Sequence, residues 1–173
     1  MSLNAEFIQR ASKEIARAKE FKMSDFADQI LQLIQELKQL MKKPPTNKEE
    51  EDYFDNRFPA ILEELSKAHD VLEENNVSAS FAELCCYDID MIDLAIELEE
   101  CPSSLDHTWL EFLLKLHEFC VLAEKADDYE TYFKISAQSL EQMHIVAKEI
   151  KTIAKAYDEK IATVEKRLEV ARS

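Results

Sequence analysis

The apolar residues of the last third of the chain recur every three or four positions without a break in phase. This spacing puts one side chain per turn on a single face of an α-helix, and it predicts a helix over 129–171. About 40 helical residues span about 60 Å, so this helix needs a partner of similar reach. The series is Phe133, Ser136, Leu140, Met143, Ala147, Ile150, Ala154, Tyr157, Ile161, Val164, Leu168 and Ala171.

The first 42 residues carry a shorter stripe of the same kind. Ile8 to Ala18 follow helical spacing, the phase is lost near residue 23, and Phe26 to Leu40 resume it. We therefore expect two helices with Ser24 capping the second, or alternatively one kinked helix. Pro44 and Pro45 end this region, because proline cannot continue the hydrogen-bond ladder.

Prolines and capping pairs divide the middle of the chain. Thr46 and Glu49 have the spacing of a capping box, so a short acidic helix is expected over 47–57. Pro59 suits the first turn of the next helix, which should end at Asn75.

Two more helices are predicted beyond residue 76. Ser80 and Glu83 form another capping box, and the helix that they begin should be broken at Pro102. Asp106 then caps a helix that reaches about Lys125 and is apolar around most of its circumference. A helix of that kind is expected at the centre of the fold.

Together these patterns predict an all-α protein, a mostly antiparallel bundle of five or six helices in a single domain, 1–173. The terminal helices, 4–42 and 129–171, should pair, and acidic middle helices should occupy 58–127.

The sequence contains no glycine. Tight hairpin turns, phosphate-binding loops and nucleophile elbows require glycine, so sheet proteins, nucleotide-binding α/β proteins and several enzyme classes are excluded.

Charge is distributed unevenly along the chain. The net charge is −15, and residues 44–130 account for −19, whereas each terminal segment is +2. Such a balance argues against nucleic acid as a partner. Asp88, Asp90, Asp93 and Glu97 lie along one predicted helix and form either a solvated face or a docking surface for another, basic protein.

The distal half of the C-terminal stripe has two interpretations. Tyr157, Ile161, Val164 and Leu168 either pack inside the protein's own bundle or pair with a partner helix. A second copy of the chain is one such partner, which would make a homodimer through the C-terminal helix.

Glu141 and His144 have the i, i+3 spacing that di-iron bundles use, but such a site needs the motif twice, so a polar edge is the simpler interpretation. His117 and Cys120 share that spacing on the predicted central helix, where a packed histidine and a buried thiol are expected. The other cysteines, of which Cys85 and Cys86 are adjacent, should be reduced. We expect no catalytic residue, cofactor or resident metal.

The first 21 residues lack the apolar core of a secretory signal, and no stretch approaches 18 apolar residues. We therefore expect a cytoplasmic protein without membrane insertion, with delivery by a specialised secretion system left open. The favoured function is a non-enzymatic interaction module: an adaptor, a regulator or a bacterial effector-type protein. The alternatives are a small acidic chaperone for a secreted client and a metal-binding bundle that uses Glu141 and His144.

Overall fold

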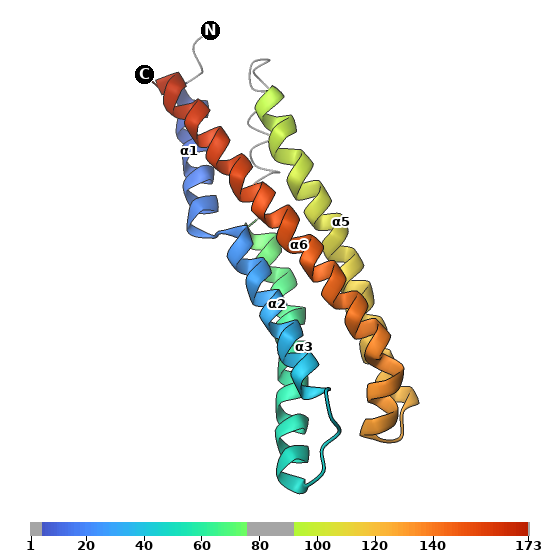
Figure 1. Ribbon diagram of the computed structural model, residues 1–173. Helices are drawn as coiled ribbons and strands as arrows, with labels where there is room; N and C mark the ends of the chain where they lie inside the picture. The colour runs from blue at the N-terminus through green and yellow to red at the C-terminus, as the bar shows by residue number, and fades with distance from the viewer. Residues whose placement is uncertain (1–4, 76–91, 173) are drawn as a thin grey trace.

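The structure is a computed structural model that describes residues 5–75 and 92–172. Within these ranges the chain forms helices and turns and no strand, which confirms the all-α class. No helix in the described ranges has both the length and the apolarity to cross a membrane. The elements are α1 (Ala5–Glu20), α2 (Met23–Leu40), α3 (Lys48–Asn75), α5 (Ile92–Leu122), the short 3-10 helix η2 (Ala123–Lys125) and α6 (Tyr129–Arg172), as drawn in Figure 1.

The long C-terminal helix predicted from the apolar stripe is confirmed as α6. Every member of the stripe from Phe133 to Leu168 is buried. Asp128 caps the helix by accepting the Thr131 N–H at 2.7 Å, and this hydrogen bond lowers the pKa of the Asp128 carboxyl. Ser136, the polar member of the stripe, donates its hydroxyl to the Tyr132 carbonyl and is thereby satisfied in the core.

Helix α6 contacts α1, α2 and α5 along its length (Figure 1). Three ion pairs define the direction of the N-terminal helices: Lys19 with Glu165, Asp28 with Lys151, and Lys38 with Glu141. Residue numbers rise along α1 and α2 as they fall along α6, so the two sides run antiparallel.

The prediction that the most apolar helix would be central is wrong. That helix is α5, and its Leu110 and Leu114 are 56% and 62% exposed. The central helix is instead α6, because its single continuous stripe meets three neighbours.

The junction between α1 and α2 is capped from another part of the chain. The predicted Ser24 cap is wrong, because the N-cap residue is Lys22 and its side chain makes no capping bond. Asp158 of α6 instead accepts the N–H groups of Met23 and Ser24, both at 3.0 Å. These are two of the N–H groups that the first turn of any helix leaves unpaired.

One helix, α3, replaces the two predicted around Pro59. The N-cap is Asn47, whose side chain accepts the Glu50 N–H at 2.8 Å, so the capping pair lies one residue later than predicted. An interior proline costs about 3 kcal/mol. The rings of Phe54 and Phe58, stacked at 4.9 Å, offset this cost by packing on aromatic side chains of α5 and α6.

The predicted break at Pro102 and the predicted cap at Asp106 are also wrong, because α5 runs continuously through both. The turns after Pro102 bury Leu105, Trp109 and Phe112, and this burial outweighs the hydrogen bond that proline removes. The predicted start at Ser80 and Glu83 lies outside the described residues.

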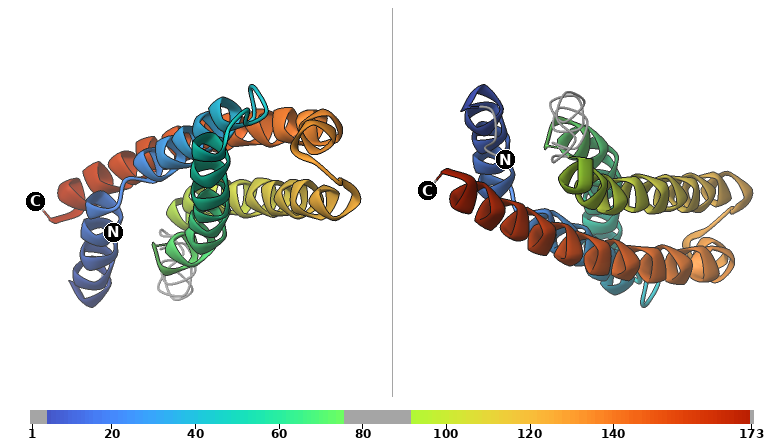
Figure 2. Two further views of the ribbon diagram at one scale, coloured as in Figure 1. Left: turned by 90° about the horizontal axis from the view of Figure 1, so that it is seen from below. Right: turned by 90° about the horizontal axis from the view of Figure 1, so that it is seen from above.

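The helices do not all run in the same direction as α6. In the two views of Figure 2, α2 and α5 follow α6 closely, whereas α1 and α3 are tilted away from its direction. A tilted helix contacts its neighbours over a shorter stretch and leaves space beside it on either side. For α3 this space forms a hollow against α2 and another against α5.

Candidate functional site

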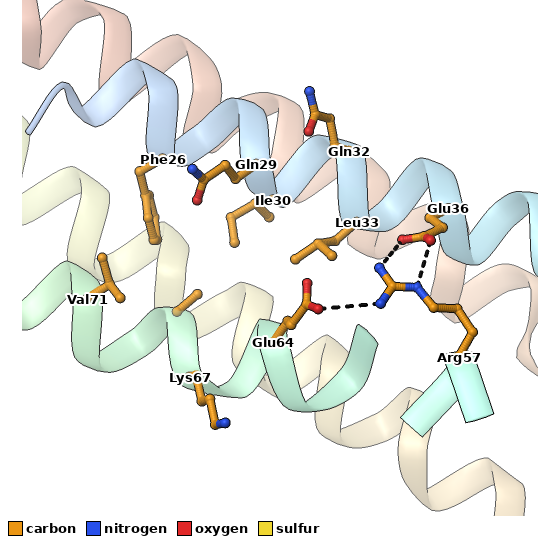
Figure 3. Close-up of a pocket in the computed structure, with 11 residues that line it drawn as sticks. Phe26, Gln29, Ile30, Gln32, Leu33, Glu36, Arg57, Glu64, Lys67 and Val71 are labelled. Atoms are coloured by element: carbon orange, nitrogen blue, oxygen red, sulfur yellow. Dashed lines mark hydrogen bonds and ion pairs between the residues drawn. The ribbon is translucent and has the colours of Figure 1, made fainter. Parts of the chain in front are cut away.

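A groove of about 430 Å³ lies between α2 and α3. Figure 3 shows Ile30 and Leu33 of α2 directed toward α3, with Glu64 of α3 directed toward α2. Val71, near the end of α3, is 39% exposed within this groove. The apolar floor, here called the groove floor, comprises Phe26, Ile30, Leu33, Ala68 and Val71.

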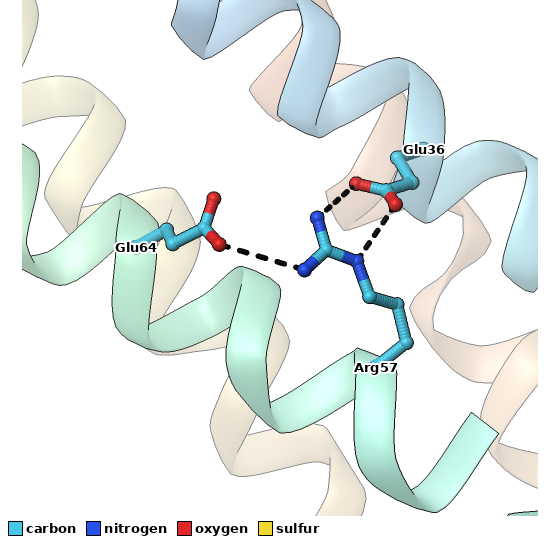
Figure 4. Close-up of polar contacts among 3 residues, drawn as sticks. All are labelled: Glu36, Arg57 and Glu64. Atoms are coloured by element: carbon cyan, nitrogen blue, oxygen red, sulfur yellow. Dashed lines mark hydrogen bonds and ion pairs between the residues drawn. The ribbon is translucent and has the colours of Figure 1, made fainter. Parts of the chain in front are cut away.

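One end of this groove is closed by an arginine between two carboxylates (Figure 4). Arg57 donates from Nε and one terminal nitrogen to the two oxygens of Glu36, at 2.7 and 2.6 Å, and its other terminal nitrogen lies 3.5 Å from Glu64. The bonds from Arg57 lower the pKa of Glu36, and the bonds to Glu36 raise the pKa of Arg57. This end of the groove, the Arg57 clamp, therefore has its carboxylates bridged by a cation.

A cleft of about 450 Å³ lies on the other side of α3, against α5. Leu72, Leu110 and Leu113 supply apolar walls, and Leu110 is among the most exposed large apolar side chains in the described residues. Trp109 lies at the base and is only 2% exposed. The α3–α5 cleft is lined by His69, Leu72, Glu73, Asp106, Trp109, Leu110 and Leu113.

The hydrogen-bond partners of His69 in this cleft indicate which of its ring nitrogens lacks a proton. Trp109 Nε1 donates to His69 Nδ1 at 3.0 Å. An indole nitrogen can only donate, so Nδ1 carries no proton, and Nε2 lies 3.2 Å from a Glu73 oxygen. Burial raises the pKa of Asp106, and the neighbouring Glu73 carboxylate raises it further.

The predicted acidic face is only partly covered by the structure. Asp88 and Asp90 lie outside the described residues, and Asp93 and Glu97 lie in the first two turns of α5, where the backbone alone is described. Negative charge also accumulates on α3, which holds ten acidic residues and three lysines or arginines.

The distal α6 residues are in the core of the chain's own helices. Tyr157, Ile161, Val164 and Leu168 are at most 3% exposed. Ile15 of α1 lines one hollow with Leu168, and Ala18 lines another with Ile161. With α1 in place, these four side chains pack within the described helices, and their pairing with a partner helix or a second copy stays a prediction.

Glu141 and His144 converge on one point, as their spacing predicts, but that point holds a lysine. Lys38 Nζ lies 2.8 Å from a Glu141 oxygen and 2.5 Å from His144 Nδ1. The pKa of His144 is lowered by burial and by the charges of Lys38 and Lys148, so the neutral ring accepts the ammonium proton. The cation that lies at this pair in the structure is the ammonium group of Lys38. Elsewhere in the described part, no three His, Cys, Asp or Glu side chains group as metal ligands.

His117 and Cys120 have different surroundings in the structure. His117 is exposed, whereas Cys120 is half-buried, and burial raises the pKa of its thiol. A reactive cysteine needs a lowered pKa, because the thiolate is the nucleophile. Cys85 and Cys86 lie outside the described residues.

No family model, no curated protein and no solved structure matches the chain.

The groove and the cleft contain residues that the sequence patterns did not single out, above all Arg57, Val71 and Leu110. One signal was present: α5 has more apolar residues than one buried face can hold, and Leu110 and Leu114 are the excess. The partnership of Arg57 with Glu36 had no comparable signal, since it joins two helices through long side chains.

Proposed function

We propose that the chain is a non-enzymatic interaction module that binds a basic, amphipathic helix of another protein in the groove between α2 and α3. The observation that carries this proposal is an open apolar floor beside a strongly acidic helix. Grooves of this kind accept the apolar face of a partner helix through side chains spaced three and four residues apart.

The apolar floor supplies the favourable free energy of association. Leu33 and Ala68 are half-buried and Val71 is 39% exposed, so each still has apolar surface for a partner to cover. Val71 has about two-fifths of its surface left to cover, which is worth about 0.6 kcal/mol, or about threefold in affinity.

The charge of α3 selects the partner. Its carboxylates outnumber its lysines and arginines by more than three to one, and residues 44–130 as a whole carry −19. A basic partner is attracted at a distance and an acidic one is rejected. The acidic residues Asp88, Asp90, Asp93 and Glu97 add to this attraction in our proposal.

Three finer proposals accompany this function. The whole chain of 173 residues forms a mostly antiparallel bundle of five or six helices in one domain, and it works in the cytoplasm.

The alternative function is a small acidic chaperone for a secreted client, which would use the same groove to hold an unfolded segment. A bound peptide that becomes helical by circular dichroism supports the module, and one that stays extended supports the chaperone.

The test uses the full chain and a synthetic helical peptide with leucines on one face and lysines on the other. Val71→Asn should weaken binding about tenfold by calorimetry, because it removes apolar surface from the groove floor and puts there an amide that the partner would have to desolvate. Ser66→Asn is the matched control, since Ser66 is exposed on the same helix and lines neither hollow. Equal affinities for the two variants would overturn the groove as the binding site.

A further inference from the structure

Helix α5 carries apolar side chains on two opposite faces. One face buries Leu105, Phe112 and Phe119 in the core. At about 3.6 residues per turn, Leu110 and Leu114 lie about half a turn around the helix from that face. They are 56% and 62% exposed, so α5 has a second, short apolar face that points away from the core.

This pair differs from the other exposed apolar side chains of the described residues. Single exposed apolar side chains are normal on a protein surface, whereas adjacent ones mark interaction sites. Leu110 and Leu114 are one helical turn apart on α5. The remaining large apolar side chains that are exposed in the described part lie at least ten residues from one another: Tyr53, Val71, Ile135, Ile145 and Val170.

The pair extends along the helix and toward α3. His107 and His117 are exposed and continue the three- and four-residue spacing, and the imidazole ring has an apolar body behind its polar edge. We call His107, Leu110, Leu114 and His117 the α5 strip. Leu110 also lines the α3–α5 cleft of about 450 Å³, so a helix lying on the strip can place an apolar side chain in the cleft.

The charges around the α5 strip favour one kind of helix. Glu111 and Glu118 follow the two leucines by one and four residues, Asp106 precedes Leu110 by four, and all three carboxylates are exposed. An acidic border of this kind attracts a helix with lysines beside its apolar face. A second copy of the chain would bring acidic borders together and would add its own net charge of −15, which disfavours self-association.

We propose that the α5 strip is a second docking surface, which binds a basic amphipathic helix independently of the groove between α2 and α3. No residue of the strip lines that groove, and α3 lies between the groove and the cleft that borders the strip. Two helices can therefore bind at once. This goes beyond the proposed function, because a chain with two docking surfaces can connect two helices, whereas a chain with one can only hold one.

The experiment counts bound peptides by calorimetry, with the full chain and the leucine–lysine peptide. The unmodified chain should bind two peptides. The strip variant, Leu110→Asn with Leu114→Asn, should bind one, because amides replace the apolar surface and would have to be desolvated. The matched control is Ile135→Asn with Ile145→Asn, which changes two exposed isoleucines of α6 that are not one turn apart, and it should still bind two. Thermal unfolding verifies that both variants fold.

A second arm tests the charge of the occupant. A peptide with glutamate in place of lysine should bind the Val71→Asn variant, in which the strip is intact, at least about tenfold more weakly than the lysine peptide. Equal affinities would overturn the basic helix as the occupant. Sedimentation of the chain without peptide tests the second copy, and self-association that only the strip variant loses would also overturn the proposal.

The stoichiometry separates this inference from the proposed function. If one peptide binds and only Val71→Asn weakens it, or if the control loses a site as the strip variant does, the α5 strip fails and the groove stands. If one peptide binds and only the strip variant loses it, the groove fails and the strip stands. If the peptide does not bind the unmodified chain, both fail.

Discussion

The two helices that precede residue 41 lie on the same face of α6 but are attached to it very differently. Helix α2 buries large side chains, among them Phe26, Ile30 and Ile34. Among the side chains of α1 that the structure describes, at 9 and 11–20, those of Ala11, Ile15 and Ala18 are buried, and two of these are alanines. Since the free energy of packing scales with the apolar area removed from water, α2 is held more strongly than this described part of α1.

Polar contacts and packing defects repeat this contrast. Helix α2 is bound to α6 by Asp158 at its first turn, by the ion pair of Asp28 with Lys151, and by Lys38 near its end. In the described part of α1, Lys19 forms an ion pair with Glu165 of α6, and hollows of about 290 and 350 Å³ flank the contact. Elements with few large contacts open at low free-energy cost, so α1 should open before the rest of the fold.

The largest expected effect is the loss of stability when a large buried side chain is shortened to alanine, and this loss should differ between α2 and α1. Ile34→Ala in α2 should lower the free energy of unfolding by about 3–4 kcal/mol, because Ile34 is fully buried in a well-packed region. Ile15→Ala in α1 should cost about 1–2 kcal/mol, since the hollows beside it let neighbours relax and α1 can open alone. Urea denaturation measures both, and equal losses would contradict the contrast. Hydrogen exchange should show α1 amides exchanging faster than α2 amides in the unmodified chain.

The next largest effect should follow from removing the side chain of α6 that caps α2. Asp158→Ala should lower the free energy of unfolding by about 1–2 kcal/mol, because the N–H groups of Met23 and Ser24 lose their acceptor. Glu159→Ala is the control, since Glu159 is exposed on the neighbouring position of α6. Losses of the same size from both variants would mean that the cap contributes nothing.

A pH-dependent contribution should come from the Lys38 cluster. The pKa of His144 is lowered in the folded state, so the unfolded chain binds this proton more readily. The stabilisation is therefore complete above pH 6.5 and is lost as the pH falls below that value toward the folded pKa. Between pH 7.5 and 5.5, the unmodified chain should lose more stability than His144→Gln, measured by thermal unfolding in matched ionic strength. A larger loss in the variant would reverse the sign and refute the assignment.

The smallest expected effect is at the ion pair that joins Lys19 of α1 to Glu165 of α6. Lys19 and Glu165 are 57% and 31% exposed, and solvent screens such pairs strongly. Lys19→Gln should leave the melting temperature unchanged within error, whereas Lys38→Gln should lower it measurably, because Lys38 also hydrogen-bonds the buried His144. A clear fall for Lys19→Gln would show that α1 depends on charge more than on packing.

Periodicity predicted the parts of the fold that depend on one continuous face. The stripe of α6 was readable because 3–4 spacing persists from Phe133 to Leu168 in an element that buries one side only. Prolines were less informative about where helices begin and end. Pro59 and Pro102 both lie within helices, since packing of the flanking turns outweighs the loss of one backbone hydrogen bond.

The candidate site was far less predictable than the helices. Its two hollows arise from the angle at which α3 crosses its neighbours, and no local pattern encodes that angle. The bonds from Arg57 to Glu36 and from Trp109 to His69 join residues 21 and 40 positions apart. The overall acidity was readable from composition. Which carboxylates an arginine bridges, as Arg57 bridges Glu36 and Glu64, depends on tertiary contacts.

The cap that Asp158 places on α2 has a consequence for synthesis on the ribosome. Asp158 follows the backbone groups that it binds by about 135 residues. At about 5–20 residues per second, the joint between α1 and α2 has no acceptor for roughly 7–27 s after it emerges. During that interval the N–H groups of Met23 and Ser24 lack this acceptor, so a peptide of residues 5–40 alone should hold the bend near Phe21 less firmly than the full chain does. The joint between α1 and α2 is therefore capped late, by the helix that is synthesised last.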